Sequence, residues 1–169
     1  MSLSEADSDD PAPSRLIEVT LDDRTILYRN ADVEQERRVA IYDLLEDNYF
    51  EPLMPLPGGY AGPFRLRLRI AEGRLAFDLA NHEDQALETV VLALSPFRRL
   101  IRDYFAVCES YFQAIKSATP SQIEAIDMGR RGLHDEASYL LMERLAEKIR
   151  IDFPTARRLF TLICVLHIK

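Results

Sequence analysis

Three arginines gather at the start of a predicted helix, where their charge is unfavourable. Ser95 and Pro96 are typical of the first positions of a helix. The cations that follow within two turns are Arg98, Arg99 and Arg102. Each faces the positive end of the helix dipole, which costs about 0.3 to 1 kcal/mol. Guanidinium groups beside free backbone N–H groups could hold a phosphate or carboxylate. We therefore predict an anion-binding site there, with ion pairs to nearby acidic residues as the alternative.

A second group of ionisable side chains lies between residues 124 and 135. Its candidates for chemistry are Glu124, Asp127 and His134. Asp127 or His134 could act as a general base while an arginine holds the substrate, and the three together could instead bind a metal ion. No HExxH or similar ligand spacing supports the metal, so we assign none. The simplest interpretation is a solvated face on which Asp127 pairs with Arg131, four residues further on.

The other residues that could do chemistry are few. Cys108 and Cys164 are far apart and lie among apolar residues, so we expect small buried hydrophobic side chains and no disulfide. His82 falls in a loop and His167 near the end of a helix. GxSxG, Walker A and strand-linked GxGxxG motifs are absent from the sequence. We therefore predict no cofactor and assign no catalytic residue.

The first half of the chain predicts strands. Residues 16–21 alternate in the way a strand does, residues 25–28 suit a short return strand, and residues 33–47 have helical periodicity. Residues 51–63 hold four of the nine prolines and three of the six glycines, which excludes regular structure. That loop is either a lid carrying Met54 and Tyr60 or a packed surface crossing.

A hairpin gives the strongest strand signal. In residues 64–70 apolar residues alternate with arginines, and in residues 75–79 they alternate with small or charged residues. Glu72 and Gly73 lie between the two runs and can form a tight turn. Residues 87–94 are more uniformly apolar, so we expect a strand in the centre of the sheet.

The second half predicts helices. They span residues 95–116, 120–131, 134–148 and 154–167, with Gly132 as the stop between the second and third. The last is apolar nearly all round, so it lies in the core or in a subunit interface, and from it we predict a homodimer. The fold class is therefore α+β: a small, largely antiparallel sheet of three to four strands followed by a helical C-terminal half.

Length and composition are those of one globular domain. The chain has 169 residues, 47% of them hydrophobic, with a net charge of −7. Residues 1–14 hold four acidic residues and no basic ones, so we expect a disordered acidic tail before a single domain at 15–169. The acidity argues against nucleic acid as a partner. No apolar run is long enough to span a membrane, so we expect a cytoplasmic protein without membrane contact.

Several long phrases resemble an uncharacterised family of small alphaproteobacterial proteins with no assigned activity. They include ADVEQERRVAIYDLLEDN, SPFRRLIRDYF, TPSQIEAIDMGRRGLHDE and TARRLFTLICVLH. The resemblance covers most of the chain except the acidic tail and the proline-rich loop, and it implies a bacterial, cytoplasmic source but no mechanism. We predict a non-catalytic binding or regulatory protein that recognises an anionic ligand or a partner protein. The alternative is a small enzyme acting on a phosphorylated or carboxylated metabolite.

Overall fold

The structure is a computed structural model that describes residues 13–22 and 31–167. The return strand expected at 25–28 lies outside the described residues, and so do the first twelve residues of the expected tail. Pro13 and Ser14 belong with the folded part, because the Ser14 carbonyl accepts a hydrogen bond from the Phe50 N–H at 3.0 Å.

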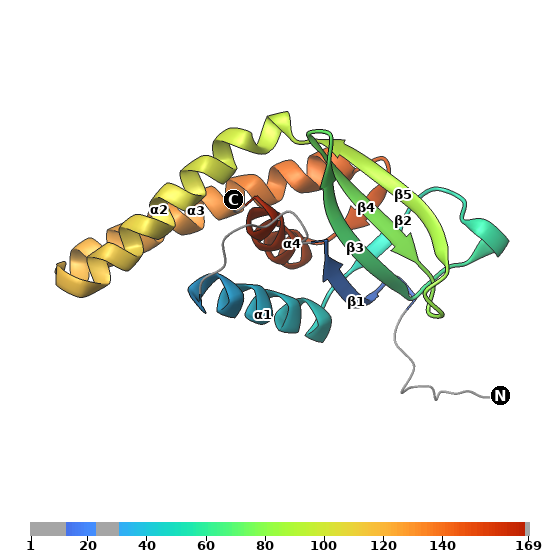
Figure 1. The fold of residues 1–169 in the computed structure, drawn as a ribbon, viewed down its shortest axis with the longest axis horizontal. Helices are drawn as coiled ribbons and strands as arrows, with labels where there is room; N and C mark the ends of the chain where they lie inside the picture. The colour runs from blue at the N-terminus through green and yellow to red at the C-terminus, as the bar shows by residue number, and fades with distance from the viewer. Residues whose placement is uncertain (1–12, 23–30, 168–169) are drawn as a thin grey trace.

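Four strands form the main sheet, in the order β1-β3-β4-β5 (Figure 1). They are β1 (Leu16–Leu21), β3 (Phe64–Ala71), β4 (Arg74–Ala80) and β5 (Ala86–Ala93). β1 runs parallel to β3 and the other pairs are antiparallel. The short strands β2 (Phe50–Pro52) and β6 (Ile149–Ile151) pair separately, in antiparallel fashion. The predicted α+β class is confirmed.

The predicted β3–β4 hairpin is confirmed. Leu66 and Leu68 are buried on the core face, while Arg69 on the other face donates to Asp78 of β4 at 2.7 Å. Glu72 and Gly73 make the turn with φ of 55° and 73°, the left-handed conformation that two-residue hairpin turns require.

β5 corrects one expectation, because it lies at the edge of the sheet and not in its centre. Its burial alternates: Val90 and Leu92 are buried, whereas Val91 and Ala93 are exposed. A nearly continuous apolar run is therefore compatible with a strand that has one solvated face.

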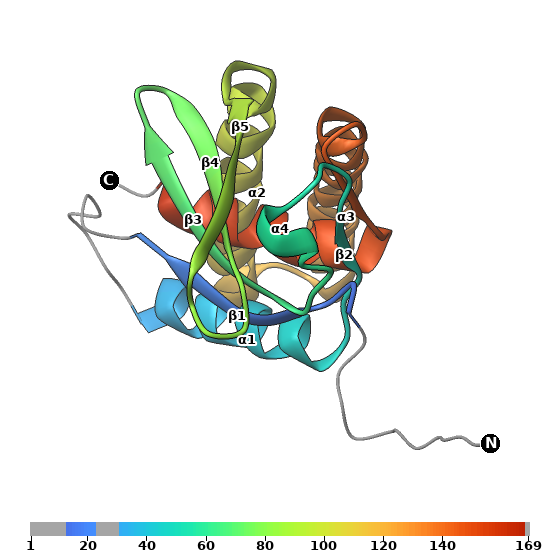
Figure 2. The same ribbon diagram turned by 90° about the vertical axis from the view of Figure 1, so that its right-hand side faces the viewer.

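The helices form a second region beside the sheet. They are α1 (Ala31–Glu46), α2 (Arg98–Ser117), α3 (Pro120–Leu145) and α4 (Phe153–Leu166), with short 3₁₀ turns η2 (Pro57–Gly59) and η3 (Ser95–Phe97). α4 lies between α1 on one side and the α2–α3 pair on the other (Figures 1 and 2). Leu159, Phe160, Leu162 and Ile163 are fully buried there, so its apolar surface is covered within one chain.

Two helix boundaries differ from the prediction. α3 is one continuous helix, and the expected stop at Gly132 is wrong. Gly132 lacks the positive φ of a C-terminal stop, and the helix continues because residues on both sides of it pack against α2. Ser95 does not cap α2, which follows directly from η3. The capping box of Thr119 and Gln122 at the start of α3 is confirmed.

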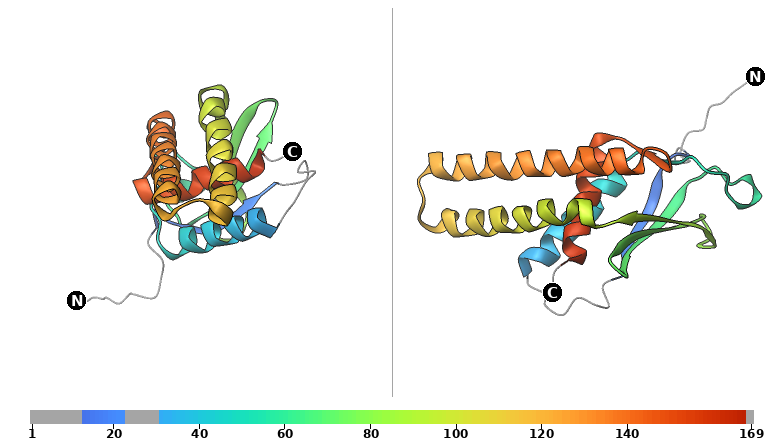
Figure 3. Two further views of the ribbon diagram at one scale, coloured as in Figure 1. Left: turned by 90° about the vertical axis from the view of Figure 1, so that its left-hand side faces the viewer. Right: turned by 90° about the horizontal axis from the view of Figure 1, so that it is seen from above.

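α2 and α3 project beyond the body of the molecule as an antiparallel pair (Figure 3). We call residues 109–130 the arm; all of them are described. Ala114 is the one buried residue in this range, whereas the parts of both helices nearer the sheet are well buried. The arm is therefore supported mainly by the packing of α2 on α3.

Candidate functional site

The three arginines at the start of α2 do not converge on one point. Arg99 pairs with Glu136 at 2.7 Å and with Asp103 at 3.3 Å, and Arg102 reaches Asp103 at 3.4 Å. Arg98 has no ion pair within the described part of the chain, and its guanidinium lies near the Gly73 turn. Acidic partners are therefore present for two of the three, and the anion site stays a prediction.

Glu124, Asp127 and His134 all lie on α3, but they are not brought together. Asp127 is held by Arg130 at 2.6 Å and Arg131 at 2.5 Å. These hydrogen bonds lower the pKa of Asp127. Glu124 is exposed on the arm, and ten residues of helix separate it from His134, about 15 Å along the axis. Asp127 therefore belongs to an ion-paired face of α3. Of the three candidates, only His134 has an unusual environment.

His134 is buried where α2, α3 and α4 meet. Its Nε2 lies 2.8 Å from the Thr161 hydroxyl, which donates its own proton to the Arg157 carbonyl at 3.3 Å. Because a hydroxyl has one proton, a Thr161 that donates to Arg157 accepts from Nε2–H, and we assign this tautomer to His134. The Nδ1 atom then carries a free lone pair, and it is buried without a hydrogen-bond partner. A buried acceptor of this kind costs about 1–3 kcal/mol unless something satisfies it.

The charge state of His134 follows from its surroundings. Burial, together with the positive charges of Arg157 and Arg130 and against an opposite effect of Asp135, lowers the pKa of the imidazole to about 4. Tyr104 and Phe160 meet the ring edge to face, with centroids 5.3 and 5.5 Å away. His134 is therefore neutral at physiological pH.

A hollow of about 320 Å³ lies between α1 and α4 with His134 in its lining; we call it the His134 hollow. Its polar lining residues are Glu36, Asp43, His134, Arg157, Arg158 and Thr161. Arg157 pairs with Asp135, and Glu36 accepts a hydrogen bond from the Tyr104 hydroxyl at 2.9 Å. Asp43 and Arg158 have no ion pair within the described residues. Glu36 likewise has no ion pair within the described residues, so the hollow offers two carboxylates and one guanidinium without a charged partner.

Sequence reasoning missed the α1 side of this hollow. Glu36 and Asp43 are seven residues apart, which places them on one face of the helix. That spacing was the available signal, but nothing local indicated that the face would meet α4.

A second hollow, of about 340 Å³, lies in the corner between α1, α2 and α4; we call it the corner groove. Its apolar lining includes Phe105, Cys108, Phe112, Cys164 and Val165. Both cysteines are free and buried, and burial raises the pKa of each thiol. Neither is an activated nucleophile, as expected from their apolar neighbours.

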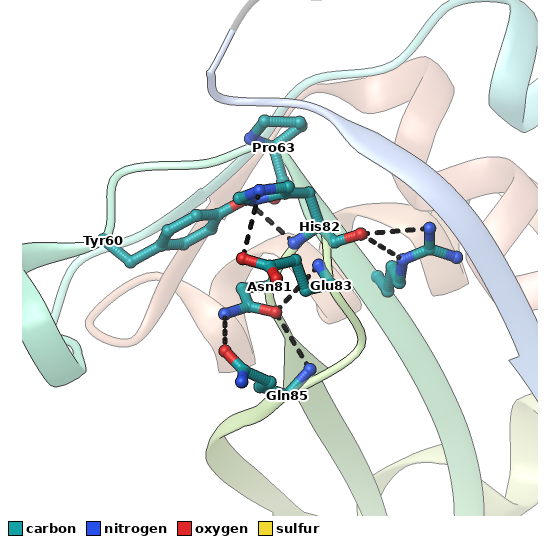
Figure 4. A network of polar contacts seen from close by, with 7 residues as sticks. Tyr60, Pro63, Asn81, His82, Glu83 and Gln85 are labelled. Carbon is teal, nitrogen blue, oxygen red and sulfur yellow. Dashed lines mark hydrogen bonds and ion pairs between the residues drawn. The ribbon is translucent and has the colours of Figure 1, made fainter.

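Polar contacts tie the proline-rich loop to the β4–β5 turn (Figure 4). The Tyr60 hydroxyl donates to the Pro63 carbonyl and accepts from the His82 backbone N–H at 3.1 Å. The rings of Tyr60 and His82 stack with their centroids 5.7 Å apart. Tyr60 also meets Phe64 edge to face. Of the two interpretations, the structure shows the packed crossing.

The turn itself is held by Asn81, whose side-chain oxygen accepts the N–H groups of Glu83 and Gln85 at 2.9 Å. The outer face of the sheet is equally well paired. Arg65, Arg67 and Arg69 bind Glu18, Asp22 and Asp78 at 3.0, 2.8 and 2.7 Å. This face therefore shows no excess of positive charge for an anion.

Residues 13–22 and 31–167 hold neither a cluster of metal ligands nor a helix that could span a membrane. They contain no group of three or more His, Cys, Asp or Glu side chains placed to hold a metal ion. No helix among them is both long and apolar enough to cross a membrane.

Comparison with known proteins places the chain in a family. Residues 13–169 match the model of an uncharacterised protein family, UPF0262. A UPF0262 protein of Erythrobacter litoralis is 60% identical over 94% of this chain and 99% of its own length. The UPF0262 protein of Sphingopyxis alaskensis is 61% identical over 95% of this chain and 97% of its own length. That of Rhizobium meliloti is 57% identical over 90% of this chain and 94% of its own length. The chain belongs to UPF0262.

The family assignment confirms the resemblance found in the sequence, including its bacterial and mostly alphaproteobacterial membership. No solved structure matches the chain. UPF0262 membership assigns no activity.

Proposed function

We propose that this UPF0262 protein is a non-catalytic binding protein whose ligand is a small amino acid, carrying both a carboxylate and an ammonium group, seated in the His134 hollow. The observation that carries the proposal is that His134 lines a hollow while its buried Nδ1, an acceptor, has no partner. An ammonium group on the ligand can donate a hydrogen bond to this acceptor, which a carboxylate cannot. Arg158 supplies a cation for the carboxylate on one wall, and Asp43 lies on the α1 side. A ligand with both a carboxylate and an ammonium group would match these charges.

The chemistry of the hollow favours binding over catalysis. A general base works best with a pKa near the working pH, whereas that of His134 is about 4. The Thr161 hydroxyl is committed to the Arg157 carbonyl, so it is not poised as a nucleophile.

The alternative, an enzyme acting on a phosphorylated or carboxylated metabolite, has one observation in its favour. The hollow joins His134 to two arginines, Arg157 and Arg158, as substrate holding by a cation beside a base would require. Turnover of a bound carboxylate, followed by NMR, would favour this alternative over the binding protein.

Thermal denaturation with matched probes tests the binding proposal. The probes are the common amino acids and the corresponding acids that lack the amino group, each at millimolar concentration. We expect at least one amino acid to raise the melting temperature, because a ligand that binds only the folded state stabilises it. Arg158→Gln should abolish this response, and Asp43→Asn should remove the preference for the amino acid over its desamino partner.

Arg74→Gln is the matched control, because Arg74 is an exposed arginine at the start of β4 and does not line the His134 hollow. The proposal fails if no carboxylate probe stabilises the protein, or if Arg158→Gln responds like the wild type.

We also propose that the protein resides in the cytoplasm. Two free, buried cysteines support this, since disulfides are rare in reducing compartments. Fractionation of the native cell with antibody detection tests the location.

A further inference from the structure

An apolar stripe on α2 begins in the core and continues, uncovered, along the arm. Its members, spaced alternately four and three residues apart, are Ile101, Phe105, Cys108, Phe112 and Ile115; we call them the seam. Ile101 is 4% exposed and Cys108 9%, whereas Phe112 is 43% and Ile115 53% exposed. The spacing is that of a helix that packs along its length against another helix. In one chain only the inner half of the seam is covered.

The corner groove continues the seam on the same side of α2. Phe105, Cys108 and Phe112 belong to both, and Cys164 and Val165 of α4 form the floor beside them. The exposed seam and the groove are therefore one apolar surface, running from the outer part of the arm into the angle between arm and body.

The charges beside this surface identify its occupant. Glu109 and Lys116 line the same groove, seven residues apart on one flank of the seam. Neither forms an ion pair within the described part of the chain. If a second α2 lies antiparallel with the two-fold axis between residues 112 and 113, Glu109 of each copy faces Lys116 of the other. The surface is thus complementary to itself, as a two-fold contact requires.

We propose that two copies of this chain associate through their seams, with the two α2 helices antiparallel. Phe112 of one copy then packs beside Ile115 of the second copy, and Glu109 and Lys116 form an ion pair on either side of the axis. In this register the end of each arm reaches Phe105 and Cys108 of the other copy and covers its corner groove. Phe112 and Ile115, which are exposed in a single chain, become buried in both copies.

Sedimentation equilibrium of the full chain over a range of concentrations tests the proposal. We expect a monomer–dimer equilibrium for the wild type. Glu109→Lys and Lys116→Glu each replace two attractive pairs by two repulsive ones, so each should weaken the dimer about tenfold. The double variant exchanges the charges and should restore the wild-type dissociation constant. Phe112→Glu should remove the dimer.

Met128→Glu is the matched control, because Met128 is 62% exposed on α3 and does not belong to the seam. Circular dichroism and melting temperature show that each variant is folded before its association is compared. A wild type that stays monomeric at the highest concentrations overturns the proposal, and so does a double charge exchange that fails to restore the dimer. Binding of an amphipathic peptide by a wild type that stays monomeric would assign the surface to another protein's helix instead.

Discussion

His134 couples the stability of the protein to pH. Its imidazole is neutral in the folded state because burial and the charge of Arg157 lower its pKa to about 4, below its ordinary value of 6.5. Between these two values the unfolded chain binds more protons than the folded one. The contribution of His134 to stability is therefore complete above pH 6.5 and is lost as the pH falls towards 4.

We expect this contribution to reach about 3 kcal/mol in the free energy of unfolding. Urea denaturation at several pH values between 4 and 7 measures it, with His134→Gln as the comparison. The variant has no imidazole to protonate, so its stability should fall less steeply in this range. His82→Gln serves as control for replacing a histidine outside the core, since His82 is exposed. Equal slopes for wild type and His134→Gln would contradict the assignment.

Gly62 is required for a close approach between the proline-rich loop and the start of the described chain. Its φ is +124°, and a Cβ at this position would fall 1.8 Å from the Pro13 carbonyl oxygen. We expect Gly62→Ala to lower the free energy of unfolding by more than about 1 kcal/mol, through both the strained backbone and the collision. Urea denaturation checks this. A variant as stable as the wild type would mean that the two segments do not touch.

At the scale of elements, local patterns predicted strands and helices well wherever burial on one face decided the pattern. The β3–β4 hairpin was predictable because alternating arginines and leucines leave one choice of face, and the start of α3 because its capping box is local. The strand order was not predictable. The sequence of β5 is apolar on both faces, and only its neighbours in space decide which face is covered. The stop at Gly132 was wrong because a glycine ends a helix only when its backbone turns left-handed, and tertiary contacts on either side prevent that.

The continuous helix has a measurable consequence. A Cβ at Gly132 would meet nothing within 4 Å, and its φ is not positive. We expect Gly132→Ala to raise the free energy of unfolding by about 0.5 to 1 kcal/mol, because alanine loses less backbone freedom in a helix than glycine does. Gly129→Ala should behave alike, for the same reasons. A loss of stability in urea denaturation would instead support a helix that ends at Gly132.

The candidate site was only partly visible in the sequence. His134 was a candidate, because a histidine among arginines and carboxylates is chemically conspicuous. Its partners Glu36 and Asp43 are about a hundred residues away, and only the packing of α1 on α4 brings them near. Conversely, Glu124 looked close to His134 in the chain but lies out on the arm. Glu124 and His134 are ten residues apart on one helix, so they are far apart along its axis. Closeness in the sequence does not show this distance.

At the scale of the whole molecule, two deletions test where the fold begins at its N-terminal side. Residues 1–12 are acidic and poor in apolar side chains, so we expect their deletion to leave the melting temperature nearly unchanged. Deletion of residues 1–14 also removes the Ser14 carbonyl that accepts from Phe50 and the Pro13 contact with Gly62. Only this longer deletion should lower the melting temperature in calorimetry. A loss after the shorter deletion would show that the acidic segment docks on the fold.

The position of α4 in the molecule also sets an order of events during synthesis. This helix, residues 153–166, is the element between α1 and the α2–α3 pair, yet it is the last of the described elements to be made. β6, which pairs with β2, comes only shortly before it. While the ribosome is still adding these residues, the faces of α1 and α3 that pack against α4 are uncovered. Until α4 has been made, the nascent chain therefore carries an incompletely covered core, and during that interval we expect it to be most exposed to aggregation and proteases.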